Sequence, residues 1–109
     1  SFIRRFSDTN KKEVVQIFTD LANKASKTLD AEGVAKKNRT TTYQVDIRYH
    51  GQGLLLTIDF DLSDLRKKGL DAIGSTFDEM HEQLFTFALP AEKELVNLRS
   101  VVRDKLIVD

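Results

Sequence analysis

The stretch from residue 43 to residue 60 constrains the fold most, because apolar and polar residues alternate on both sides of two closely spaced glycines. A period of two is typical of half-buried strands, and two such runs joined by a glycine-containing turn predict a β-hairpin. One face of the first strand carries Tyr43, Val45, Ile47 and Tyr49, and the other carries Gln44, Asp46, Arg48 and His50. After Gly51-Gln52-Gly53, one face of the second strand carries Leu54, Leu56, Ile58 and Phe60. The pattern predicts a sheet that is covered on a single side.

Apolar residues at helical spacing predict a helix on each side of this hairpin. The first apolar stripe consists of Val14, Phe18, Leu21, Ala22, Ala25 and Leu29. We expect Asn10 to cap that helix with Glu13 as its capping-box partner, and Gly33 to end it. A polar connector at 34–41 then leads into the hairpin. The second helix is expected from about Leu70 to Phe87, with a core-facing stripe of Leu70, Ile73, Phe77, Met80 and Leu84.

Alternation returns from Glu94 to Arg103 and predicts a third strand, while the residues after 105 fit either a short fourth strand or a severed connection. The order α-β-β-α-β predicts an α+β fold: a two-layer sandwich with an antiparallel sheet of about three strands and two helices on one face. A right-handed crossover places the third strand parallel to the second, with strand order 2-1-3. The residues expected between the layers are Phe18, Leu21, Val45, Ile47, Leu56, Ile58, Phe77 and Leu84.

Composition sets the wider limits. The 109 residues suffice for one domain, and 17 basic residues balance 17 acidic ones, so no net field recruits nucleic acid. No apolar run reaches the roughly 18 residues of a membrane span, and the absence of cysteine fits the cytoplasm. We therefore expect a cytoplasmic protein without nucleic-acid or membrane partners. Since the chain starts without methionine, residues 1–109 are interpreted as one domain cut from a longer chain.

The hairpin tip carries the first candidate site, formed by Arg48, His50, Gly51 and Gln52. Arginine offers a planar donor fork for carboxylate or phosphate, and glutamine both donates and accepts. Such a set suits a polar substrate or a carboxylate of a neighbouring domain. The alternative is an ordinary hairpin in which Arg48 pairs with Asp46 or Asp59.

The second candidate is His81, three residues after Asp78 on the expected second helix. An acid and a histidine at this spacing share a helix face and suit a metal site or an oriented base. The alternative is a surface histidine beside the core stripe. No third ligand is in sequence reach, so no metal site is predicted. No phosphate-binding glycine loop occurs, so no cofactor is expected in this part of the protein.

Four segments together resemble the C-terminal region of the hydantoinase/oxoprolinase family, A-type subunit. They are the helix ending near Ala31-Glu-Gly, the hairpin Asp46-Ile-Arg-Tyr-His-Gly-Gln, the helix from Phe77 through His81 to Phe85, and the strand Glu94-Leu-Val-Asn-Leu-Arg99. They come in the family's order and approximate spacing.

The resemblance implies an ATP-dependent, N-methylhydantoinase- or 5-oxoprolinase-like hydrolase that opens cyclic amides, with related members that carboxylate ketones. It also implies that ATP and Mg belong to the parent enzyme, and that the nucleotide-binding fold lies upstream. The expected partners are the remainder of the same chain and a second hydantoinase-type subunit. This domain would supply interface or substrate-side contacts and be inactive alone. The rival hypothesis is a free-standing α+β interaction module without catalytic activity.

Overall fold

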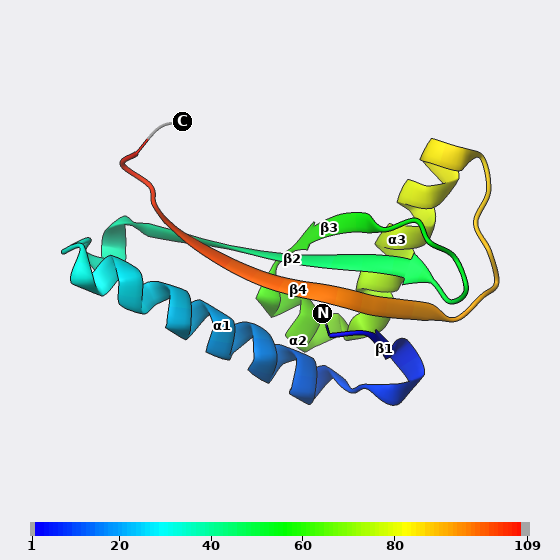
Figure 1. Cartoon of the computed structure of the whole chain (residues 1–109), viewed down its shortest axis with the longest axis horizontal. Coiled ribbons are helices and arrows are strands. Elements are labelled where there is room, and N and C mark those ends of the chain that lie inside the picture. Colours follow the sequence, from blue (N-terminus) through cyan, green and yellow to red (C-terminus); the bar gives the residue numbers. More distant parts are fainter. Residues whose placement is uncertain (1, 108–109) are drawn as a thin grey trace.

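The computed structural model describes residues 2–107 as an elongated α+β domain with principal extents of 47 × 29 × 25 Å. Strand β1 (Arg4–Arg5) precedes helix α1 (Lys11–Ala31), and strands β2 (Arg39–Tyr49) and β3 (Leu56–Phe60) follow. Helices α2 (Leu62–Lys68) and α3 (Leu70–Phe85) then lead to strand β4 (Lys93–Asp104). Single 3-10 turns lie at Phe6–Asp8 and Lys36–Asn38. Figure 1 shows the long β2–β4 ribbon with α1 along one half and α3 at the other end.

The sheet has the strand order β1-β4-β2-β3, and every neighbouring pair is antiparallel. The expected order of the three main strands is therefore confirmed, since β2 lies between β3 and β4. The two-residue strand β1, at the outer edge of β4, was not predicted. Strand β2 starts at Arg39, inside the expected connector, because residues 39–42 pair with the end of β4. The residues after β4 form a turn rather than a strand as far as Ile107, and Val108 lies outside the described residues.

The hairpin is wider at its tip than expected. Its last ladder pair joins Ile47 to Leu56, so Leu54, which was expected on the apolar face, belongs to the loop together with Leu55, and both are exposed. Beyond that pair, Arg48 and Tyr49 pair only with β4. Gly51 adopts φ +83°, a conformation that side chains rarely allow, which fixes the turn at the tip.

A β-bulge interrupts the β2–β4 ladder after Asp46. Asp46 faces Asn97, whereas Ile47 faces Leu95, so one residue of β4 is left over. Strict alternation along β4 would place Glu94 on the same face as Leu98, among the helices. The extra residue instead puts Leu95 in the core and Glu94 beside Arg48.

Both helical regions follow local signals. The side chain of Asn10 accepts a hydrogen bond from the backbone N–H of Glu13, which confirms the expected N-cap of α1. Helix α3 begins at Leu70, as expected, and ends at Phe85, two residues before the expected end; the short helix α2 before it was not expected. Gly69, with φ +76° and ψ −172°, lies between α2 and α3 in a conformation that only glycine adopts readily.

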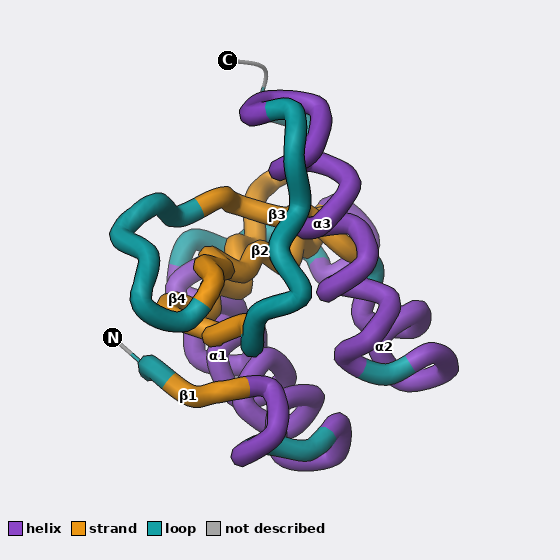
Figure 2. Tube along the Cα trace, turned by 90° about the vertical axis from the view of Figure 1, so that its right-hand side faces the viewer, coloured by secondary structure: helices purple, strands orange, loops and turns teal. Residues whose placement is uncertain are grey.

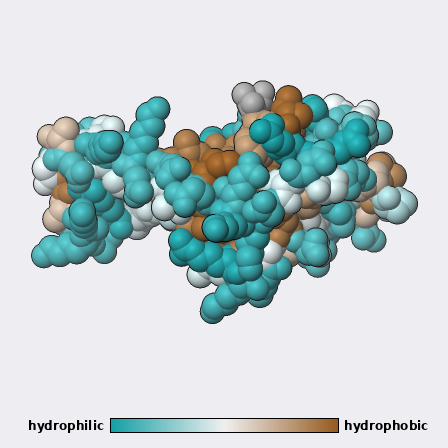
Figure 3. Space-filling view, turned by 90° about the horizontal axis from the view of Figure 1, so that it is seen from below, coloured by the Kyte–Doolittle hydropathy of each residue, from teal (hydrophilic) through white to brown (hydrophobic). Residues whose placement is uncertain are grey.

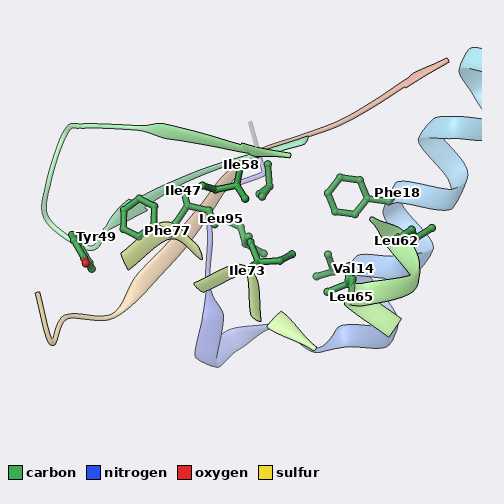
Figure 4. Close-up of a cluster of buried hydrophobic side chains, with 11 residues drawn as sticks. Val14, Phe18, Ile47, Tyr49, Ile58, Leu62, Leu65, Ile73, Phe77 and Leu95 are labelled. Atoms are coloured by element: carbon green, nitrogen blue, oxygen red, sulfur yellow. The ribbon is translucent and has the colours of Figure 1, made fainter. Parts of the chain in front are cut away.

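The core lies between one face of the sheet and all three helices, as Figure 4 shows. Its fully buried side chains include Phe18, Ile47, Ile58, Phe77 and Leu95. Three of the expected core residues differ: Leu21 and Leu56 are half-buried, and Leu84 is 59% exposed. Leu84 is exposed because the last turn of α3 extends beyond the sheet (Figure 1), so the core-facing stripe ends at His81.

The distribution of hydrophobic residues on the surface is consistent with a core that lies between the sheet and the helices. Figure 3 shows a mostly hydrophilic face with hydrophobic patches near the middle of the molecule. None of the helices within residues 2–107 has the length and apolar character of a membrane span.

Candidate functional site

Polar side chains of β2, β3 and β4 cover the sheet face opposite the helices. They alternate along β2 with the core residues Val45, Ile47 and Tyr49, so the pleat directs them to the other face. They form two groups that we name by their central carboxylates, the Asp46 cluster and the Glu94 cluster.

In the Asp46 cluster, one carboxylate receives four hydrogen bonds. Arg99 donates two in a fork, from Nη1 to Oδ2 at 2.8 Å and from Nη2 to Oδ1 at 2.6 Å. Thr57 Oγ1 donates to Oδ1 at 2.7 Å, and Asn97 Nδ2 donates to Oδ2 at 2.9 Å. Gln44 extends the cluster by donating to Asp59. Because every donor comes from a neighbouring strand, the cluster fastens β3, β2 and β4 to one another.

Electrostatics follow from this geometry. The Arg99 fork lowers the pKa of the Asp46 carboxyl far below its usual range, more than burial raises it, and the bonds from Thr57 and Asn97 add to the decrease. Asp46 is only 7% exposed, so an ionised carboxylate is stable here because its acceptor sites are filled. Because both oxygens of the Asp46 carboxylate already accept two hydrogen bonds each, we interpret the Asp46 cluster as a structural element of the sheet.

The Glu94 cluster lies nearer the hairpin tip. Arg48 Nε donates to Glu94 Oε1 at 3.0 Å, and His50 Nδ1 lies 3.1 Å from Glu94 Oε2. His50 Nε2 lies 3.1 Å from Arg5 Nη2. A guanidinium only donates, so Nε2 accepts and Nδ1 carries the proton that is donated to Glu94. The bonds from His50 and then Arg48 lower the pKa of Glu94.

Arg48 keeps unused donors. It pairs across the strands with Glu94, not with Asp46 or Asp59, so the expected cross-strand pair exists with a different partner. Only Nε is engaged; within residues 2–107, neither terminal nitrogen of Arg48 has a hydrogen-bond partner. The adjoining tip residues, His50, Gly51 and Gln52, are exposed. The structure brings Arg48 and His50 together at Glu94, and sequence reasoning missed that Glu94 and Arg5 join them.

His81 lies apart from the hairpin tip, and the alternative of a surface histidine is wrong. It is 7% exposed and packs against Tyr49, Phe85 and Phe87, with ring centroids 4.9–5.0 Å apart. Its Nδ1 lies 2.6 Å from the carbonyl oxygen of Phe87 and donates to it, which pins the chain after α3. Asp78 does not pair with His81.

Asp78 accepts a hydrogen bond from the hydroxyl of Tyr49 at 2.6 Å and pairs with Lys93 at 3.1 Å. Burial, followed by the bond to Asp78, raises the pKa of Tyr49. Asp78 and His81 are therefore separate structural contacts rather than one site.

Among the residues described, no three side chains of His, Cys, Asp or Glu gather closely enough to hold a metal ion. The central polar residues of the sheet face, in the Asp46 and Glu94 clusters, are paired with one another, whereas the terminal nitrogens of Arg48 have no partner within residues 2–107.

Comparison with known proteins identifies the family to which this domain belongs. The family model of the hydantoinase/oxoprolinase C-terminal domain matches residues 5–94, which is most of the chain and includes both clusters except Asn97 and Arg99. The chain therefore belongs to the hydantoinase/oxoprolinase family, as a domain of the C-terminal type. The search of curated proteins found no match. The search of solved structures likewise found none.

Proposed function

We propose that this domain is part of an ATP-dependent enzyme that opens cyclic amides such as hydantoin, N-methylhydantoin or 5-oxoproline. Family membership supports the class of reaction. In this proposal ATP and Mg bind in other parts of the enzyme, a second hydantoinase-type subunit completes it, and the assembly works in the cytoplasm. The domain supplies interface or substrate-side contacts and has no activity by itself.

The role proposed for this domain rests on one observation: Arg48 uses only its Nε as a donor, and its two terminal nitrogens have no partner within residues 2–107. Glu94 fixes the side chain through Nε, while the terminal nitrogens stay available for a carboxylate of the substrate or of a neighbouring domain. A guanidinium held in this way is preorganised, because the entropy of ordering it is already lost in the folded domain. His50 and Gln52 provide further polar groups beside it.

Arg48→Lys in the full-length enzyme is expected to lower turnover by on the order of tenfold while the fold persists, because lysine retains the charge but loses the fork. Arg103→Lys is the matched control, since Arg103 is an exposed β4 arginine outside both clusters. Steady-state turnover and thermal unfolding of both variants provide the measurement. Normal turnover in Arg48→Lys and in Gln52→Ala would leave Arg48 with a structural role only.

The isolated domain is expected neither to hydrolyse ATP nor to open a cyclic amide. Phosphoryl transfer requires positioned charges and metal ions around the transferred group; the sequence has no phosphate-binding glycine loop, and the described residues hold no cluster of three His, Cys, Asp or Glu side chains. Calorimetry with ATP and magnesium, followed by product assays on 5-oxoproline and hydantoin, tests this expectation. Saturable ATP binding, or turnover above a heat-killed control, would contradict it.

A further inference from the structure

The two edges of the sheet differ. The β1 edge is two residues long and consists of two exposed arginines, which is how natural proteins discourage pairing with another strand. The β3 edge is five residues long and has no lysine, arginine, proline or bulge. Within residues 2–107, strand β3 pairs only with β2, so its outer side is an open edge in the described part of the chain. Figure 2 shows β3 beside α3, at the far side of the sheet from β1.

A groove accompanies this open edge. It has a volume of about 240 Å3 between β3 and helices α2 and α3, and its apolar lining includes Ile58, Phe60, Leu65 and Ile73. On α3, Ala72 and Thr76 line it with small side chains. An added strand would direct alternate side chains toward the helices, and this groove lies where those side chains would go.

The charges around the groove indicate what kind of strand fits. Asp59 and Asp64 line the groove, and a second hollow of about 400 Å3 shares them and adds Asp61. All three carboxylates are exposed, and only one lysine, Lys68, lines the groove with them. A second copy of β3 would bring Thr57 and Asp59 rather than basic residues. The complementary partner alternates apolar residues with lysine or arginine.

We infer that the open edge of β3 receives an extended strand from the rest of the same hydantoinase/oxoprolinase chain, with apolar residues in the groove and basic residues against Asp59, Asp61 and Asp64. This inference rests on the proposed function, because it requires the domain to be one part of a larger enzyme. Pairing within one chain also needs little intrinsic affinity, since tethered segments meet at millimolar effective concentrations.

Hydrogen exchange in the full-length enzyme tests this docking. Thr76→Trp fills the groove, whereas Ser75→Trp places the same ring on the neighbouring exposed position of α3, which does not line the groove. In Thr76→Trp, amides of Leu56–Phe60 and of one segment outside this domain are expected to exchange about tenfold faster. Ser75→Trp is expected to behave as wild type. Unchanged exchange at Leu56–Phe60 in Thr76→Trp, with α3 intact, would overturn the inference.

Charge-reversal variants provide a second, independent test of the proposed docking. Asp64→Lys is expected to speed exchange of the same two segments, while Asp71→Lys, an acidic residue in the first turn of α3, leaves them unchanged. Protection at β3 that rises with protein concentration would identify a second copy as the occupant and overturn the inference. These readouts do not involve Arg48, so a failure here is distinguishable from a failure of the Arg48→Lys test.

Discussion

Replacing Phe77 by alanine is expected to lower the free energy of unfolding by about 3–5 kcal/mol. The Phe77 side chain is completely buried, and its ring meets that of Tyr49 edge-on at 4.8 Å. Its loss would leave a cavity between α3 and the sheet. A domain of this size has a total stability of roughly 5–15 kcal/mol, so the variant would be marginal or unfolded. Urea unfolding followed by circular dichroism measures the change.

Leu84→Ala on the same helix provides the control. The sequence pattern assigns both residues to one stripe, yet Leu84 is 59% exposed. Its replacement is therefore expected to change stability by no more than about 0.5 kcal/mol. Similar losses for Phe77→Ala and Leu84→Ala would contradict the described end of α3.

Asp46→Asn is expected to cost about 2 kcal/mol near neutral pH, because the amide cannot accept the charged Arg99 fork at both oxygens. The estimate is at the low end for a buried ion pair because the Arg99 side chain is 41% exposed. Asp59→Asn is the matched control, since Asp59 is an exposed carboxylate on the same face with one side-chain partner, Gln44.

This cost is expected to depend on pH in a definite direction. The folded pKa of Asp46 lies below the value of about 3.9 for an unfolded aspartate. The carboxylate therefore stabilises the fold fully above about pH 5, and this contribution is lost as the pH falls below 4 toward the folded pKa. Asparagine has no such titration, so the difference between wild type and Asp46→Asn should narrow in acid. If the difference in unfolding free energy between wild type and Asp46→Asn stayed constant from pH 7 to pH 3, Asp46 would not be the source of the acid-sensitive stability.

Local signals were enough to predict the layers, and the strand order followed from a general rule on crossover connections. The period-two pattern within Tyr43–Ile47 and Leu56–Phe60, the Asn10 cap and the stripe through Phe77 each depend on neighbours in sequence, and each is confirmed. Leu84 was assigned wrongly because helical periodicity does not reveal where the sheet beneath the helix ends.

The candidate site was predicted only in part, for a related reason. The sequence grouped Arg48 with His50 and Gln52, because residues of one hairpin tip are close in space. The partner of Arg48 depends on a bulge in a strand more than forty residues away, and that bulge has no glycine or proline to reveal it. The burial of His81 is not evident from the sequence because Phe87 meets its ring only after the chain turns at Thr86, whereas Phe85 is its neighbour on α3 itself.

The place of β4 in the sheet has a consequence for how the domain folds. The last strand in sequence pairs with β2 along its whole length, from Arg39 with Asp104 to Tyr49 with Lys93, and also holds β1. Contacts between such distant positions have a large loop-closure cost, so the sheet is expected to form late and cooperatively. On the ribosome, α1 and the hairpin therefore have an uncovered apolar face until β4 has been synthesised. The domain is therefore expected to complete its fold only after the chain has been synthesised through Asp104.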